Sequence, residues 1–274
     1  MAATTAPAGG KGVILDSRLR KYLITVHGMP APWPYPSHIA HRGGGLLAPE
    51  NTLAAMRAGA RHGFRMVEFD VKLSRDGVPF LLHDDTLDRT TDAQGPAAGL
   101  AYADLARLDA GGWHSPAYTG EPVPTFRAVA RYAIANGIAC NVEIKPNPGQ
   151  ETQTGTAVAM AARQLWQDVG PAPLLSSFSE AALEAARVAA PELPRALLVE
   201  EVPQDWLQRL RRYECVALNI NHRDATPALI DAVHEAGFRI AAWTINDPAR
   251  ARLLLSWGLD GIFTDALADI APPK

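Results

Sequence analysis

Residues 66–85 read MVEFDVKLSRDGVPFLLHDD, and the rest of the chain can be understood around them. Three apolar side chains alternate here with Glu68, Asp70 and Lys72. This period of two predicts a β-strand with one apolar face and one charged face. Two acidic residues at this spacing often lie on a solvent-exposed strand. The apolar character of the remaining segment favours a buried strand instead.

A turn follows this strand and reverses the chain. Residues 75–77 (RDG) have a turn sequence, in which Gly supplies the positive φ that such turns need. A second apolar run then leads to His83. If Ser74 pairs with about Pro79 in the resulting hairpin, Asp70 lies opposite about His83. The hairpin therefore predicts that two carboxylates and an imidazole meet at one place.

Composition limits the classes of function. The chain has 274 residues, 47% hydrophobic and 20% charged, which is typical of a soluble protein with a large core. A net charge of −3 gives no support for nucleic-acid binding. No apolar run reaches the ~18 residues of a membrane span, and the first residues lack a signal-peptide core. Two cysteines, Cys140 and Cys215, form no disulfide framework. We expect a cytoplasmic protein without stable membrane association. The sequence does not decide the oligomeric state, and a homo-oligomer is one alternative.

The order of the elements predicts the fold class. Residues 1–36 are interpreted as an N-terminal arm with a proline-rich connector, and residues 37–274 as the main unit. In that unit, helical patterns repeatedly end in Gly before an apolar residue, as at Gly63 and Gly237, which indicates βα units and a parallel sheet. We expect a (β/α)₈ barrel. A doubly wound open sheet is the alternative, but no dinucleotide-binding glycine pattern follows the first strand. The predicted strands are Ile39–His41, Met66–Val71, Ala139–Lys145, Leu174–Phe178, Arg195–Glu200, Val216–Ile220, Arg239–Ile245 and Gly261–Thr264.

In such barrels the chemistry lies at the carboxyl ends of the strands. Glu68, Asp70 and Glu143 fall there, on strand faces whose opposite sides are apolar and must meet the helices. Buried, unpaired carboxylates cost several kcal/mol each, so the three acidic residues need cations nearby. Lys145 offsets one charge, and oxygen ligands favour Mg²⁺ or Ca²⁺ for the rest.

These residues occur within a longer series of motifs. The motifs are His41-Arg42-Gly43, PENT at residues 49–52, ExDV at 68–71, HDDTLDRTT at 83–91, NVEIKP at 141–146, SSF at 176–178 and GIFTD at 261–265. This series resembles the glycerophosphodiester phosphodiesterases. The likeness covers roughly residues 38–270, and its second half is most similar to the bacterial cytosolic UgpQ-type enzymes. The family is a (β/α)₈ barrel with a small insertion after the catalytic hairpin, which corresponds here to about residues 87–124.

The resemblance implies a function and a site. The reaction would be metal-dependent hydrolysis of glycerophosphodiesters to sn-glycerol 3-phosphate and an alcohol. The assigned roles are metal binding by Glu68, Asp70 and Glu143, acid–base catalysis by His41 (base) and His83 (acid), and phosphate binding by Arg42 and Lys145. Independently of the family, two imidazoles suit proton transfer at neutral pH, and cations suit a phosphodiester anion. Trp243 is placed against the glycerol carbons, although it could equally fill the barrel.

Three other functions compete with this one. Lys145 at a strand end could form a Schiff base, as in an aldolase, but the histidines and carboxylates would then be superfluous. A lysophospholipase D-type phosphodiesterase would use the same residues on a lipid. A non-catalytic phosphate-binding barrel would have no chemical need for both His41 and His83.

Overall fold

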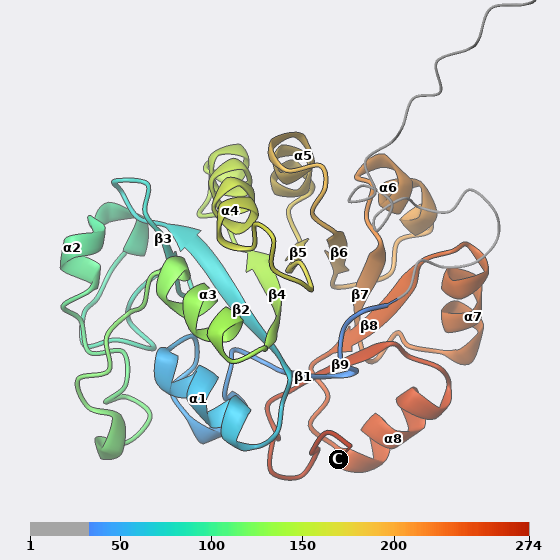
Figure 1. Ribbon diagram of the computed structural model, residues 1–274, viewed down its shortest axis with the longest axis horizontal. Helices are drawn as coiled ribbons and strands as arrows, with labels where there is room; N and C mark the ends of the chain where they lie inside the picture. Colours follow the sequence, from blue (N-terminus) through green and yellow to red (C-terminus); the bar gives the residue numbers. More distant parts are fainter. Residues whose placement is uncertain (1–32, 274) are drawn as a thin grey trace, which may run out of the picture.

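The computed structural model describes residues 33–273, so residues 1–32 of the predicted arm lie outside the described residues. In the described part, eight parallel strands close into a barrel surrounded by helices (Figure 1). The sheet order is β1-β9-β8-β7-β6-β5-β4-β2-β3, and pairing of β1 with β2 completes the ring. The predicted (β/α)₈ barrel is confirmed.

The predicted strands are all present, and none of their ends differs from the prediction by more than two residues. Parallel strands buried on both faces give long apolar runs with clear ends, which explains this agreement. The strands are β1 (His38–Ala40), β2 (Met66–Leu73), β3 (Pro79–Leu81), β4 (Ala139–Ile144), β5 (Leu174–Ser177), β6 (Arg195–Val199), β7 (Ala217–Asn221), β8 (Arg239–Trp243) and β9 (Gly261–Thr264).

The hairpin of β2 and β3 forms as predicted, but its expected register is wrong by one residue. Leu73 pairs with Pro79, so Ser74 lies opposite Val78 and Asp70 opposite Leu82. The turn sets this register, because the backbone N–H of Ser74 donates to the carbonyl of Val78 at 3.1 Å. His83 therefore lies one residue beyond the position opposite Asp70, in the loop that follows β3.

Five of the eight α-helices in the described residues begin at a side-chain cap. The hydroxyl or carboxylate of the residue before α1, α3, α5, α7 and α8 accepts a backbone N–H of the first turn. Within residues 33–273 no helix has the length and apolar content to cross a bilayer. The α-helices are α1 (Leu53–Arg61), α2 (Tyr102–Leu105), α3 (Phe126–Ala135), α4 (Glu151–Leu165), α5 (Glu180–Ala189), α6 (Trp206–Arg212), α7 (Pro227–Glu235) and α8 (Pro248–Ser256).

The chain between β3 and α3 forms the predicted insertion, which contains α2 and lies at one side of the barrel (Figure 1). It has a small apolar core of its own, which continues from β3. This core fixes the loop that carries His83 to the outside of the barrel. Its buried members are Phe80, Leu82, Leu87, Ala97, Leu105, Ala110 and Val123.

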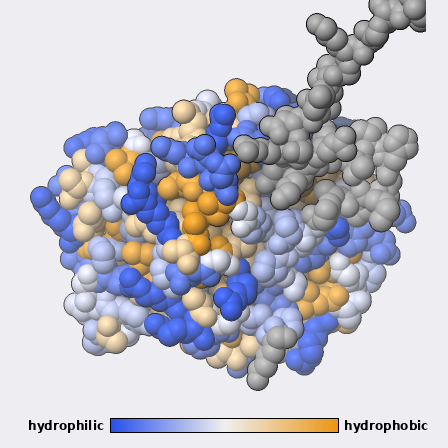
Figure 2. Space-filling view, in the orientation of Figure 1, coloured by the Kyte–Doolittle hydropathy of each residue, from blue (hydrophilic) through white to orange (hydrophobic). Residues whose placement is uncertain are grey.

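The interior of the barrel is apolar at its floor and polar above. At the amino ends of the strands, Tyr35 joins Met66, Leu174 and Phe263 in one cluster, and its hydroxyl donates to Ala172 O at 2.9 Å. On the face drawn in Figure 2, hydrophilic side chains cover the outer helices and hydrophobic ones gather in small areas between them. The buried polar side chains of the interior, Glu68, Asp70 and Glu143 among them, lie above this floor.

We expect Gly155→Ala to destabilise the barrel wall. A Cβ at Gly155 would clash with the backbone carbonyl of Ala182, where α4 and α5 pack closely. Overpacking costs ~1–3 kcal/mol, more than the ~1 kcal/mol that Ala gains over Gly in a helix. Gly99→Ala is the control, because a Cβ there meets nothing within 4 Å. Urea unfolding of both variants tests this expectation, and equal midpoints would contradict it.

Candidate active site

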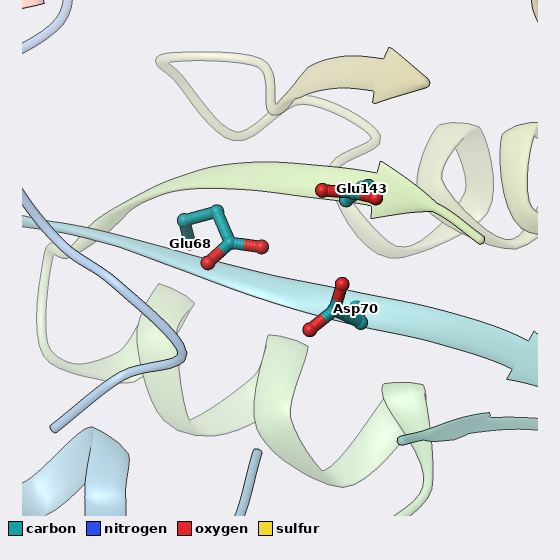
Figure 3. Close-up of side chains that lie close together, drawn as sticks. All are labelled: Glu68, Asp70 and Glu143. Atoms are coloured by element: carbon teal, nitrogen blue, oxygen red, sulfur yellow. The ribbon is translucent and has the colours of Figure 1, made fainter. Parts of the chain in front are cut away.

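Glu68, Asp70 and Glu143 meet at the carboxyl ends of β2 and β4. One carboxylate oxygen from each lies within 4.8 Å of the others, and the side chains face a common space (Figure 3). The strand register causes this arrangement, because Asp70 pairs with Glu143 and Glu68 lies two residues earlier on the same face. The structure thus brings together the three acidic residues that the sequence singled out.

Hydrogen bonds from the loop after β1 hold two of these carboxylates in place. The backbone N–H of Arg42 donates to Glu68 Oε2 at 2.9 Å. The side chain of Asn51 donates to Asp70 Oδ2 at 2.8 Å and accepts the backbone N–H of Asp70 at 3.0 Å. Asn51 has a φ of 59°, which turns its side chain inward while Thr52 caps α1.

Burial and mutual repulsion give the three acidic side chains different pKa values. Burial, with Asp70 nearby, raises the pKa of Glu68 to about 8 and that of Glu143 to about 7. Burial alone would also raise the pKa of Asp70, but the charges of Lys145 and Arg42 outweigh it and lower that pKa to about 2. The protein's own cations thus stabilise one of the three anions well.

The donor set fits a hard divalent cation. All three candidate ligands offer oxygen, which Mg²⁺ and Ca²⁺ prefer. Among the described residues, Glu68 Oε1 is buried and has no hydrogen-bond partner. A buried carboxylate oxygen without a donor is costly, and a coordinated cation would remove that cost. Glu68, Asp70 and Glu143 can therefore hold a metal ion.

Two cationic side chains flank the acids. Lys145 Nζ lies 3.1 Å from Glu143 Oε1 and 3.5 Å from Asp70 Oδ1, and Arg42 Nε lies 3.8 Å from Asp70 Oδ2. Burial would lower the pKa of Lys145, but Asp70 and Glu143 together raise it. A lysine held in its charged form is a poor nucleophile, which disfavours Schiff-base chemistry at Lys145.

His41 is oriented by the last strand of the barrel. Its Nδ1 lies 2.6 Å from Asp265 Oδ1, and Asn246 donates to the other oxygen of that carboxylate at 3.1 Å. The Nε2 of His41 lies 3.8 Å from Glu68 Oε2, so it faces the acidic cluster. Burial lowers the pKa of His41, but the hydrogen bond to Asp265 and the charge of Glu68 outweigh burial and raise it.

His83 is oriented by its neighbour in the chain. Its Nδ1 lies 2.6 Å from Asp84 Oδ1. Burial lowers the pKa of His83, and the charge of Asp70 only partly opposes this. The two histidines therefore stand on different loops with opposite pKa shifts, which is the pattern expected of an acid–base pair.

An aromatic pair completes the rim on the side of β5 and β8. Phe178 and Trp243 pack edge to face with ring centroids 5.5 Å apart, and Lys145 Nζ lies 5.9 Å from the Phe178 centroid. Phe178 is 42% exposed, so one face of its ring is open to solvent. Trp243, the predicted substrate-binding residue, therefore contributes to the rim of the site as well as to the apolar cluster at the barrel floor.

Comparison with known families agrees with this geometry. Residues 41–268 match the model of the glycerophosphoryl diester phosphodiesterase family. The chain belongs to this family. The prediction that it is a glycerophosphodiester phosphodiesterase is confirmed.

Bacterial relatives of this phosphodiesterase align over most of their length. Protein YhdW of Bacillus subtilis is 32% identical, with 83% of this chain and 93% of YhdW covered. The glycerophosphodiester phosphodiesterase of Caldanaerobacter subterraneus is 29% identical, with the same shares of coverage. The structure of an Oleispira antarctica phosphodiesterase in complex with the product sn-glycerol-3-phosphate superimposes with a TM-score of 0.81 and 36% identity, and covers 86% of this chain and 95% of that one.

Some residues of the phosphodiesterase site were not predicted as such. The sequence analysis quoted Asn51, Phe178 and Asp265 within motifs but gave them no role in the site. A signal existed for Asp265, since it follows the last strand at the end where the chemistry lies. For Asn51 the left-handed backbone that directs its side chain is not evident from the sequence.

We expect metal binding to release protons below about pH 8. The raised pKa values of Glu68 and Glu143, about 8 and about 7, mean that both carboxyls hold protons at pH 6 in the metal-free protein. A cation must displace those protons, so affinity for Mg²⁺ or Ca²⁺ should rise with pH, by up to ~10-fold per unit for each proton displaced.

Calorimetric titration in two buffers of different ionisation enthalpy counts these protons. Glu143→Gln is the control, because it removes one titrating ligand and should lower the number released. Metal binding at pH 6 without any proton release would contradict the expectation.

Proposed function

We propose that this phosphodiesterase hydrolyses glycerophosphodiesters to sn-glycerol 3-phosphate and an alcohol, with Mg²⁺ or Ca²⁺ bound by Glu68, Asp70 and Glu143. The observation that carries the proposal is the buried carboxylate cluster with Lys145 and Arg42 beside it. The Oleispira antarctica relative, whose structure contains sn-glycerol-3-phosphate, supports the choice of product.

Phosphate binding falls to Arg42 and Lys145. A phosphodiester is an anion that repels nucleophiles, and its nonbridging oxygens gain charge as the transition state forms. A divalent cation held by Glu68, Asp70 and Glu143 would supply part of the neutralising charge. The guanidinium of Arg42 can contact two oxygens at once, and the ammonium of Lys145 adds a point charge next to Glu143.

His41 is the proposed general base. The 2.6 Å contact of its Nδ1 with Asp265 makes Nε2 the nitrogen that is free to accept a proton. Water attacks phosphorus and gives its proton to this nitrogen.

His83 is the proposed general acid. As the bond between phosphorus and the alcohol oxygen breaks, protonated His83 donates a proton to that oxygen. The proton taken by His41 and the one given by His83 balance, so each turnover leaves the two histidines with exchanged protonation states that solvent restores.

The aromatic rim is assigned to the glycerol end of the substrate. The Phe178 ring lies 5.9 Å from Lys145 Nζ and packs against Trp243, and both rings belong to loops or strands other than the one that carries His83. Carbon atoms of glycerol can pack on these rings while the phosphate contacts the lysine. The alcohol then leaves on the side of His83.

The central experiment measures release of glycerol 3-phosphate from glycerophosphocholine, glycerophosphoethanolamine and glycerophosphoglycerol. We expect turnover with added Mg²⁺ or Ca²⁺, loss of turnover with chelator, and recovery when the cation is restored. Glu143→Gln should weaken metal binding yet stay folded, since β4 is held by its neighbours on both sides. Full activity of a metal-stripped sample would contradict the metal assignment, and binding of phosphate without turnover would contradict an enzyme.

The two histidines should respond differently to the leaving group. An alkoxide such as that of choline needs a proton, whereas p-nitrophenolate scarcely does. His83→Ala should therefore lose ~10²-fold or more on glycerophosphocholine and much less on a p-nitrophenyl phosphodiester of glycerol. His41→Ala should lose activity on both substrates, because the attacking water must be deprotonated whichever group leaves.

The comparison of kcat for the two variants on the two substrates decides the roles. If His41→Ala is the variant spared by the good leaving group, the acid and the base are exchanged. If both variants lose equally on both substrates, the histidines act through position or charge rather than as one acid and one base.

A further inference from the structure

Arg89 connects the two loops that carry the proposed acid and one of the proposed phosphate ligands. Its Nε and Nη2 donate to the two oxygens of Asp84 at 2.7 and 3.1 Å. Its Nη1 and Nη2 donate to the two oxygens of Glu50 at 2.7 and 2.8 Å. One guanidinium thus makes four hydrogen bonds to two carboxylates from separate loops.

Each of these carboxylates contacts a residue of the site. Asp84 Oδ1 lies 2.6 Å from His83 Nδ1. Glu50 Oε1 accepts Arg42 Nη1 at 2.7 Å. A continuous series of side chains therefore runs from Arg42 through Glu50, Arg89 and Asp84 to His83.

Glu50 is the fixed end of this series. Its side chain is 13% exposed and lies between two arginines, in the loop that leads into α1. Asp84 follows β3 on an irregular loop and is held mainly by Arg89. The hydrogen bond from Arg89 lowers the pKa of Asp84, so this carboxylate stays ionised and accepts the Nδ1–H of His83. That leaves Nε2 as the nitrogen that carries the acidic proton.

We propose that Arg89 is a positioning residue that anchors Asp84 to Glu50 and thereby holds His83 in line with the leaving group. The proposal rests on the proposed function, in which His83 is the general acid. Only arginine supplies donors in a planar fork that can bind two carboxylates at once, whereas lysine presents a single charged nitrogen. Among the described contacts, Arg89 makes none with the side chains proposed to bind phosphate or metal, so its effect on His83 passes through Asp84.

The alternative is that Arg89 only joins the insertion to the barrel. In that case its loss would lower stability and would reduce activity on all substrates alike. Action through His83 instead predicts a loss that depends on the leaving group. The two roles therefore separate in the ratio of kcat values for a poor and a good leaving group.

The test measures kcat of Arg89→Ala and Arg89→Lys on glycerophosphocholine and on the p-nitrophenyl diester, with the metal-loaded enzyme. We expect Arg89→Ala to lose ~10-fold or more with choline as the leaving group and far less with p-nitrophenol. Arg89→Lys should recover only part of the loss. Because the Arg89 side chain is 44% exposed, free guanidinium can reach its place. At ~20 mM, far below denaturing concentrations, guanidinium should restore Arg89→Ala on the choline substrate.

Arg187→Ala is the matched control. Arg187 also joins two carboxylates, Glu184 and Glu214, but on α5 and the loop before β7. Its removal should change neither kcat value. Thermal unfolding of each variant confirms that the compared proteins are folded.

The double variant Arg89→Ala/His83→Ala completes the test. If Arg89 acts through His83, the double variant should lose little more activity on the choline substrate than His83→Ala alone. An equal loss on both substrates for Arg89→Ala, without rescue by guanidinium, would overturn the proposal while His83→Ala keeps its substrate dependence. If His83→Ala itself shows no such dependence, the acid assignment fails first and the role of Arg89 falls with it.

Discussion

Repulsion among three buried carboxylates is the constraint on which the site depends. Glu68, Asp70 and Glu143 are held together by the register of β2 with β4, which the fold cannot relax without losing the sheet. Like charges at such distances in a poorly hydrated place cost several kcal/mol unless cations offset them. Three features offset this repulsion: the positive charges of Arg42 and Lys145, the hydrogen bonds of Asn51, and the fit of the site to a divalent cation.

The two halves of the barrel contribute differently. Strands β1 to β4 and their loops carry the acids, the cations and both histidines. Strands β5 to β8 contribute the aromatic rim of Phe178 and Trp243 and otherwise a small-residue interior that includes Ala196, Ala217 and Ala241. The acidic cluster and the aromatic rim are thus carried by separate parts of the chain, and they meet where Lys145 lies 5.9 Å from the Phe178 ring centroid.

Much of this could be predicted from the sequence because the decisive patterns are local. The alternation of apolar and charged side chains along β2 and β4 predicts the strands, the face on which the acidic residues lie, and their spacing. The motifs of the family suggest roles for these residues that spacing alone cannot. The predicted hairpin register is wrong by one residue, because the hydrophobic pattern does not reveal turn hydrogen bonds such as that of Ser74 with Val78. The partnership of His41 with Asp265 spans 224 positions and emerges only when the ring closes. The bonds of Asn51 to Asp70 depend on a backbone conformation that few residues adopt.

The closure of β9 on β1 has a consequence for how the enzyme is made. The backbone N–H of His41 donates to Thr264 O at 3.0 Å, and its ring is held by the next residue along. On the ribosome the three acidic residues have all been synthesised once β4 has emerged, whereas Asp265, the partner of His41, follows β9 and is synthesised much later. A chain that ends before β9 therefore lacks the group that orients the proposed base. The orientation of the proposed base therefore depends on closure of the full ring.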